Sequence, residues 1–262
     1  MATASLALAK LGVSSSYMGA VGDDPAAATA LAPLKRAGVD CSGVKRVAGG
    51  RTRRALILVE QAGGEREVRP ERDPRVRLTP NDLDRARLES ARALLVDTED
   101  PEAASWAAKL ARASGIPVVL DAGQPGEGSI ELLSKVDFPI VSGEFAECFW
   151  DGSAREALRE LASRARRMAV LTLGASGAIA QARDGDRVIE SPGFRVAALD
   201  TTGAGDVFHA AFIWGLLEGL SVRAVLRAAN AAAALSCRSL GAQGGLTNRE
   251  ALEALLETEA AG

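Results

Sequence analysis

Residues 200–212, DTTGAGDVFHAAF, place two glycines and two carboxylates directly before an apolar stretch with helical spacing. A helix that begins near Gly203 points unpaired backbone N–H groups and the positive end of its dipole toward the preceding turn, where an anion can bind. Asp206, in the first turn, can accept a proton from a hydroxyl while the amides stabilise the phosphoryl group that the hydroxyl attacks. The residues alone leave a simpler role open, in which one of residues 200–202 caps the helix and Gly-Ala-Gly forms the turn.

The composition favours an enzyme that acts on small molecules. The chain has 262 residues, of which 47% are hydrophobic, and a formal net charge of −3 with the charged residues interspersed. Nothing in it therefore predicts a nucleic-acid or membrane partner. Three scattered cysteines argue against a disulfide framework, and a single histidine, His209, does not suggest a histidine-rich metal site. No apolar run reaches the roughly 18 to 20 residues of a membrane span, and we predict a cytoplasmic protein.

Short β-branched runs alternate with alanine-rich stretches of helical period, which is the pattern of β-α-β units and a mostly parallel sheet. Helices are predicted at 100–115, which begins at Asp-Pro and stops at Gly115, and at 153–167, with Ser153 as the N-cap. The C-terminal third, from Gly203 onward, predicts successive helices. The predicted buried strands are 91–97, 116–121, 138–142 and 168–174.

Two segments break this alternation. Residues 53–69 predict two strands joined at Gly63-Gly64, and residues 178–190 predict a hairpin that turns at Asp184-Gly185. The first of these hairpins lies early in the chain, and we expect it to project from the main sheet as a lid.

Residues 200–212 resemble the D-T-x-G-A-G-D signature of the ribokinase-like, or PfkB, family of carbohydrate kinases. Three further segments are similar to the family and occur in its order: LAKLGVSSSYMGAVGDDPAAATALAPLKRAGVD (8–40), VLTLGASGAIA (170–180) and RAANAAAALSCRSLGAQGGL (227–246). The resemblance implies a single α/β domain over residues 1–262, a three-layer α/β/α ribokinase-like sandwich with a mostly parallel central sheet. Residues about 50–70 would form its small β lid.

The same resemblance implies an ATP-dependent kinase that phosphorylates a hydroxyl of a sugar or sugar-like molecule. Asp206 would be the base that deprotonates the hydroxyl, and Gly203, Ala204 and Gly205 would supply the anion hole for the γ-phosphoryl group. Arg72 would lie near the sugar, unless it is an exposed residue on a polar loop.

Nucleotide and cation positions follow from the resemblance as well. Thr172, Gly174 and Gly177 would line the nucleotide phosphates or ribose, with Asn230 near the adenine. Relatives that need a monovalent cation hold it with residues that match Asp200 and Thr202, so potassium is a candidate ion.

The match is weaker where many relatives carry N-x-x-E, whose glutamate helps to organise magnesium. This chain has VSGEFAE at 141–147, with Ser142 in place of the asparagine and Phe145 in place of the glutamate. Glu144 or Glu147 is a candidate to reach magnesium through water, and a solvated carboxylate at a helix start is the alternative for each. The serine resembles ketohexokinase-like members, while DAGQ at 121–124 lacks the D-x-N-x-R pattern of some ribokinases.

Family members usually carry a strand with a sugar-binding aspartate and a Gly-Gly-x-x-x-N segment upstream of a helix like ATASLALAKLG. Neither precedes this helix in the sequence, so we expect either a trimmed start or a relative that binds nucleotide or sugar with impaired or no catalysis. A dinucleotide-dependent enzyme is disfavoured because the glycine motif does not follow the first strand. The lid of relatives often pairs between subunits, and a homodimer is therefore expected.

Overall fold

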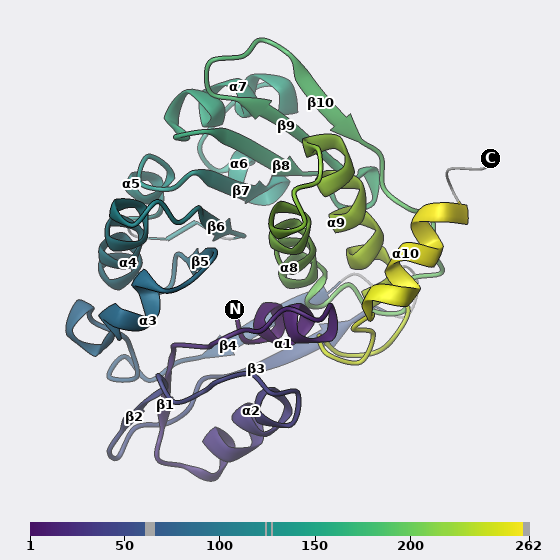
Figure 1. Ribbon diagram of the computed structural model, residues 1–262. Helices are drawn as coiled ribbons and strands as arrows, with labels where there is room; N and C mark the ends of the chain where they lie inside the picture. The colour runs from purple at the N-terminus through teal and green to yellow at the C-terminus, as the bar shows by residue number, and fades with distance from the viewer. Residues whose placement is uncertain (61–65, 124, 127, 259–262) are drawn as a thin grey trace. The chain divides into compact units, whose positions relative to one another are not determined.

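The computed structural model describes residues 1–60, 66–123, 125–126 and 128–258 (Figure 1). The chain divides into two compact units, each built from segments that are distant in the sequence. The first unit contains Met1–Leu83, Arg195–Trp214 and Ala231–Gly262, and the second contains Asp84–Phe194 and Gly215–Asn230.

A six-stranded sheet organises the second unit. Its strands are β5 (Leu94–Asp97), β6 (Val118–Ala122), β7 (Phe138–Ser142), β8 (Met168–Thr172), β9 (Ala178–Ala182) and β10 (Val188–Ser191). They neighbour one another in the order β10-β9-β8-β7-β6-β5, with β5 to β8 parallel and the β8–β9 and β9–β10 pairs antiparallel. The four predicted strands and the second predicted hairpin are therefore confirmed.

Short helices connect the parallel strands of this sheet. They are α4 (Pro101–Ala113), α5 (Ser129–Leu133), α6 (Gly143–Glu147) and α7 (Ala154–Arg164), and α3 (Arg85–Glu89) precedes β5. Ser153 caps α7 as predicted, in a capping box with Glu156, and Gly115 follows α4 with a φ of 74°. Successive parallel strands are neighbours, so right-handed crossovers place these helices on one face of the sheet.

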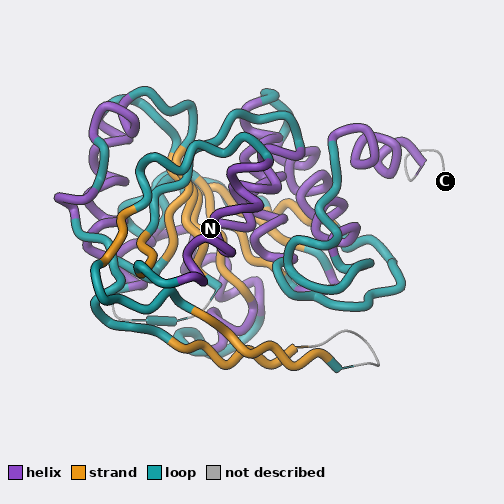
Figure 2. The backbone as a smooth tube through the Cα atoms, turned by 90° about the horizontal axis from the view of Figure 1, so that it is seen from below, coloured by secondary structure: helices purple, strands orange, loops and turns teal. Residues whose placement is uncertain are grey.

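The first unit begins with α1 (Ala2–Lys10), β1 (Ala20–Gly22), α2 (Pro25–Arg36) and β2 (Lys45–Val47), and β1 pairs with β2 in parallel. The predicted lid follows as β3 (Arg54–Val59) and β4 (Arg66–Glu71). These two strands are antiparallel, with Arg54 opposite Glu71, and Figure 2 shows them running together as a two-stranded ribbon. The predicted Gly63-Gly64 turn lies outside the described residues.

The three predicted C-terminal helices are α8 (Ala204–Leu217), α9 (Val222–Ser236) and α10 (Arg249–Thr258). Both α8 and α9 contribute residues to each of the two units. No helix among the described residues combines the length and the apolar character that crossing a membrane requires.

Candidate active site

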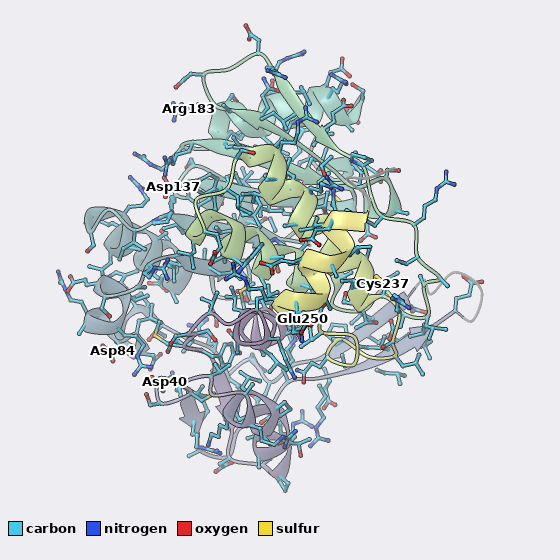
Figure 3. The ribbon with its side chains drawn as sticks, turned by 45° about the vertical axis from the view of Figure 1, so that its right-hand side comes forward. Asp40, Asp84, Asp137, Arg183, Cys237 and Glu250 are labelled. Atoms are coloured by element: carbon cyan, nitrogen blue, oxygen red, sulfur yellow. The ribbon has the colours of Figure 1, made fainter. Side chains whose placement is uncertain are left out.

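Asp200 fixes the turn that precedes α8. Its side chain is buried; Oδ1 accepts a hydrogen bond from the Thr202 amide at 2.8 Å, and Oδ2 accepts one from the Gly241 amide at 2.7 Å. The carbonyl of Cys237, which is labelled in Figure 3, accepts the amides of Leu199 and Asp200 at 2.8 and 3.2 Å. The turn is therefore held against the chain segment that follows α9.

Gly203 and Gly205 occupy this turn for different reasons. Gly203 has a φ of +80°, and a Cβ there would lie 2.8 Å from Ala242 Cβ, so both its conformation and its surroundings require glycine. Gly205 lies inside α8, without a positive φ, and a Cβ at this position would meet no atom of the described residues within 4 Å. Protein packing therefore does not explain the glycine at 205.

The first amides of α8 are available to a ligand. The amide of Ala204 donates to the carbonyl of Thr201 at 3.2 Å, whereas those of Gly205 and Asp206 donate to no acceptor in the described part of the chain. Unpaired N–H groups at a helix start, next to open space, form a binding position for an anion.

Asp206 lies in the first turn of α8 with its side chain 27% exposed, and Oδ1 accepts a hydrogen bond from the Met1 nitrogen at 2.9 Å. His209 follows one turn later. Its Nδ1–H donates to the Gly205 carbonyl at 2.5 Å, and its buried ring packs edge-on against Phe208. The carboxylate is thus the side chain of this turn that is both ionisable and accessible.

Thr202 presents a different feature. Its Oγ1 is buried and has no hydrogen-bond partner in the described part of the structure. A buried hydroxyl without a hydrogen-bond partner costs about 1 to 3 kcal/mol of stability. A bound ion or ligand that contacts Thr202 Oγ1 would remove this cost.

In the second unit, the predicted nucleotide turn follows β8. Thr172 ends the strand and its Oγ1 donates to the Val141 carbonyl at 3.4 Å. Gly174 begins a single 3-10 turn (Gly174–Ser176) and Gly177 follows it, with φ values of +55° and +96°. A Cβ on Gly177 would lie 2.2 Å from the Ser191 carbonyl oxygen, so this glycine allows the turn and the segment after β10 to pack together.

Asn230 holds that same segment. Its Nδ2 donates to Ser191 O, Ser191 Oγ and Pro192 O at 2.9, 3.0 and 3.3 Å, and the side chain is buried. The sequence did not predict these partners, because they lie 38 to 39 residues earlier in the chain. Asn230 therefore fixes the backbone of residues 191–192, which packs on Gly177. The expected closeness of Asn230 to the adenine stays a prediction.

The segment 141–147 gives the two anomalous residues structural roles. Ser142 caps α6 by accepting the Phe145 amide at 3.0 Å, and its hydroxyl donates to the Gly123 carbonyl at 2.9 Å. Phe145 is fully buried, with its ring 4.9 Å from that of Phe149. Glu144 and Glu147 are both exposed on α6, so this segment has two accessible carboxylates.

The predicted residues thus form two groups. The first unit holds Arg72 and residues 200–206, and the second holds Thr172, Gly174, Gly177, Asn230 and Glu144. Arg72 directly follows β4, with an exposed side chain. In the described part of the chain no three His, Cys, Asp or Glu side chains are grouped to hold a metal ion.

An α/β protein whose helix start combines free amides with a carboxylate is equipped for phosphoryl transfer. The model of the pfkB family carbohydrate kinases matches residues 2–249, and the chain belongs to this family. It is a carbohydrate kinase with a three-layer, ribokinase-like fold.

Known relatives agree with this assignment. A ribokinase of Bacillus subtilis is 31% identical over 261 residues, covering 97% of this chain and 86% of the relative. An ATP-dependent ribose-1-phosphate kinase of Halopiger xanaduensis is 30% identical over 244 residues, covering 92% and 80%. The crystal structure of a Thermotoga maritima ribokinase is similar with a TM-score of 0.85 and 25% identity, covering 98% of this chain and 86% of that one.

Proposed function

We propose that this carbohydrate kinase transfers the γ-phosphoryl group of ATP to a hydroxyl of a sugar or sugar-like molecule, with Asp206 as the general base. Residues 203–205 would form the anion hole. The observation that carries the proposal is the start of α8, where the amides of Gly205 and Asp206 have no acceptor among the described residues and lie beside an open position at Gly205.

The chemistry divides between the amides and the carboxylate. Asp206 accepts the proton of the attacking hydroxyl as its oxygen forms a bond to the γ-phosphorus and the bond from that phosphorus to the β,γ-bridging oxygen breaks. Within the 203–205 turn the Gly205 amide, which has no acceptor among the described residues, stabilises the negative charge on the phosphoryl oxygens, and the Asp206 amide lies beside it. ADP leaves, and the proton on Asp206 passes to solvent after the reaction.

Thr172, Gly174, Gly177 and Asn230 are the residues that we assign to the nucleotide. Magnesium commonly binds through one or two carboxylates together with substrate phosphates, so a site without three protein carboxylates is compatible with it. Glu144, exposed on α6, is the residue that we assign to the metal through water. Magnesium would neutralise phosphate charge there.

Potassium is supported by Thr202. Its buried Oγ1 has no partner in the described residues, and Asp200, two residues earlier, supplies a buried negative charge. An alkali cation that contacts this hydroxyl would satisfy it and offset the carboxylate charge. We propose that Asp200 and Thr202 help to hold potassium.

The lid exposes apolar side chains, as a surface that pairs with another protein chain does. Leu56, Ile57, Leu58 and Val68 are 59, 38, 46 and 40% exposed, and contiguous exposed apolar surface marks interaction sites. We propose that two copies of the chain pair through this hairpin. Sedimentation of Leu56→Glu and the unchanged protein tests this, because loss of the dimer is expected only in the variant.

The candidate substrates fall into a few classes of sugar. The relatives act on ribose or ribose-1-phosphate, as their names state, and ketoses or sugar acids are the other classes that we include. The relatives are kinases, which does not favour a non-catalytic binder. ADP release measured across sugars, with and without potassium, would identify the substrate.

Replacing Asp206 tests the base. General-base catalysis contributes about 10²- to 10⁴-fold, so Asp206→Asn is expected to lower kcat with the best sugar by at least about 100-fold. Glu218→Gln, a change of the same kind in the second unit, serves as the control. Phosphorylation by Asp206→Asn within about tenfold of the unchanged protein would refute the assignment.

A further inference from the structure

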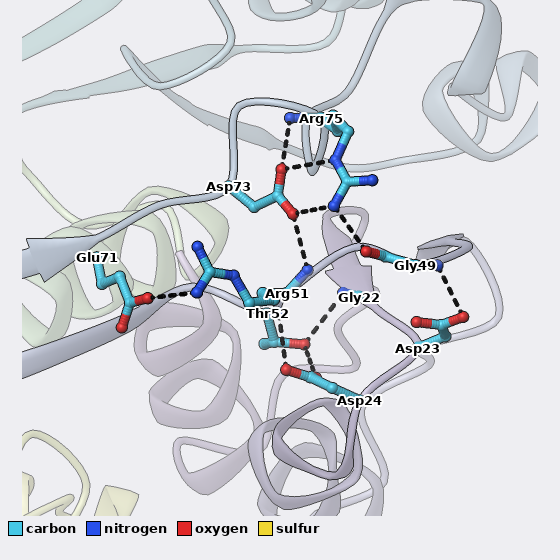
Figure 4. Close-up of polar contacts among 9 residues, drawn as sticks. All are labelled: Gly22, Asp23, Asp24, Gly49, Arg51, Thr52, Glu71, Asp73 and Arg75. Carbon is cyan, nitrogen blue, oxygen red and sulfur yellow. Dashed lines mark hydrogen bonds and ion pairs between the residues drawn. The ribbon is translucent and has the colours of Figure 1, made fainter.

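The root of the lid is held by a polar network that the proposed chemistry does not use. The chain enters the lid through residues 47–53 and leaves it through residues 71–77. Figure 4 shows the side chains that connect these two stems to each other and to the start of α2. We call the residues Asp23, Asp24, Thr52, Asp73 and Arg75 the root clamp.

Thr52 is the link between the entering stem and the body of the first unit. Its Oγ1 accepts a hydrogen bond from the Gly22 amide at 3.0 Å and donates to Asp24 Oδ1 at 2.5 Å, and the side chain is buried. The Thr52 amide donates to Asp24 Oδ2 at 3.1 Å. Asp24 also caps α2 by accepting the Ala27 amide at 3.2 Å, so one carboxylate fixes a helix start and a lid stem.

Asp73 and Arg75 connect the two stems. The Asp73 carboxylate is buried and accepts the Arg51 amide at 3.0 Å, while the Arg75 guanidinium donates to both of its oxygens at 3.0 and 2.7 Å. The same guanidinium donates to the Gly49 carbonyl at 2.6 Å. Bidentate, charge-assisted pairs of this kind fix geometry, so each stem holds the other in place.

Glycines allow the entering stem to lie against β1. A Cβ on Gly22 would be 2.2 Å from the Gly50 carbonyl oxygen, and a Cβ on Gly50 would be 2.8 Å from Val76 Cγ2. The Gly49 amide donates to Asp23 Oδ2 at 2.9 Å. The stem is therefore fixed by close backbone packing as well as by hydrogen bonds.

Beyond the root, the lid has little packing to set its direction. Along β3, Leu56, Ile57 and Leu58 are all exposed, and the ion pair of Arg69 with Glu67 lies within one exposed strand. Within a single copy of the chain, a hairpin whose apolar β3 residues are exposed takes its direction from its root. We propose that the root clamp sets the direction of the lid and thereby the affinity of the enzyme for its sugar.

Threonine and arginine variants with matched controls test the proposal, whose kinetic part rests on the proposed function. Thr52→Val keeps the shape of the side chain and removes both hydroxyl hydrogen bonds, and Thr52→Ser restores them. Thr29→Val is the control, since its exposed hydroxyl contacts only the Pro25 carbonyl of its own helix. Arg75 is largely exposed, so Arg75→Ala should fold, with the nearby exposed Arg77→Ala as its control.

Hydrogen exchange and steady-state kinetics are the readouts. In Thr52→Val and Arg75→Ala, the β3 amides are expected to exchange about tenfold faster, and the KM for the sugar to rise about tenfold, since lost buried hydrogen bonds are worth a factor of this order. The KM for ATP should stay within about twofold, and Thr52→Ser, Thr29→Val and Arg77→Ala should resemble the unchanged protein.

Two results would overturn the proposal. The first is that, in both Thr52→Val and Arg75→Ala, the exchange rates of the β3 amides and the KM for the sugar stay within about twofold of those of the unchanged protein. The second is that the KM for the sugar and the KM for ATP rise by the same factor. Failure of the unchanged protein to phosphorylate any sugar would instead refute the proposed function. The exchange rates of β3 would then decide alone whether the clamp holds the lid.

Discussion

Gly205 allows the anion hole to be tested separately from stability. It lies inside α8, and a Cβ there meets nothing within 4 Å in the part of the chain that the structure describes, so Gly205→Ala removes backbone freedom from the unfolded chain without a clash. The gain in helix propensity is at most about 1 kcal/mol, and less near a helix end. We therefore expect the free energy of unfolding to stay the same or to rise by some tenths of a kcal/mol.

Activity should change in the opposite direction. If the γ-phosphoryl group lies against the amides of residues 203–205, the new methyl group occupies space that the anion needs. Loss of one donor in an anion hole lowers kcat by about 10² to 10³, or about 2.7 to 4 kcal/mol. We expect kcat/KM of Gly205→Ala to fall by a factor in this range while the protein remains at least as stable.

Gly203→Ala provides the contrast. Here the left-handed φ of +80° costs about 1 to 2 kcal/mol, and the 2.8 Å approach to Ala242 Cβ adds the penalty of overpacking. This variant should lose stability and activity together. Urea unfolding and a coupled ADP assay measure both quantities, and a Gly205→Ala protein with kcat/KM within about threefold of the unchanged one would refute the anion hole at this turn.

Three further predictions concern the surroundings of the site. Thr202→Val should remove any stimulation by potassium over sodium while the potassium-free rate stays similar; unchanged stimulation would contradict the cation assignment. Asn230→Asp places a carboxylate against three oxygens, so we expect loss of about 1 to 3 kcal/mol of stability and a higher KM for ATP. A destabilised variant with unchanged KM would separate Asn230 from the nucleotide. Hydrogen bonds from Arg75 and the Arg51 amide hold the pKa of Asp73 well below its ordinary value. The stability that the Asp73 carboxylate contributes is therefore complete above about pH 4 and is lost as the pH falls further. Between pH 7 and pH 3, the thermal midpoint of Asp73→Asn should fall less with decreasing pH than that of the unchanged protein.

The local elements could be predicted because their signals are local. The Ser153 capping box, the end of α4 before Gly115 and the strands of the parallel sheet all follow from residues that are close in the sequence. The D-T-T-G-A-G-D segment likewise predicts a helix that begins near Gly203, and α8 begins at Ala204. Such features depend on propensity, capping and hydrophobic period, which a single sequence records.

Contacts between distant segments left no comparable signal. Thr52 and Asp24 are 28 residues apart, and Asn230 and Ser191 are 39 apart; neither pair has a spacing that identifies its partner. The reason for glycine at 177 is also non-local, since the close approach of Ser191 requires it in addition to the positive φ. The anchoring of the lid and the support of the turn after β8 are therefore visible only in the structure.

The segment after β7 shows how a departure from the family pattern can be absorbed structurally. Ser142 caps α6 and also holds the Gly123 carbonyl, while Phe145 packs with Phe149. A carboxylate at position 145 would be buried without a partner among these rings, which is costly. Position 145 is therefore part of the hydrophobic core of this chain. A protein carboxylate that assists magnesium must come from another position, and we assign this role to the exposed Glu144.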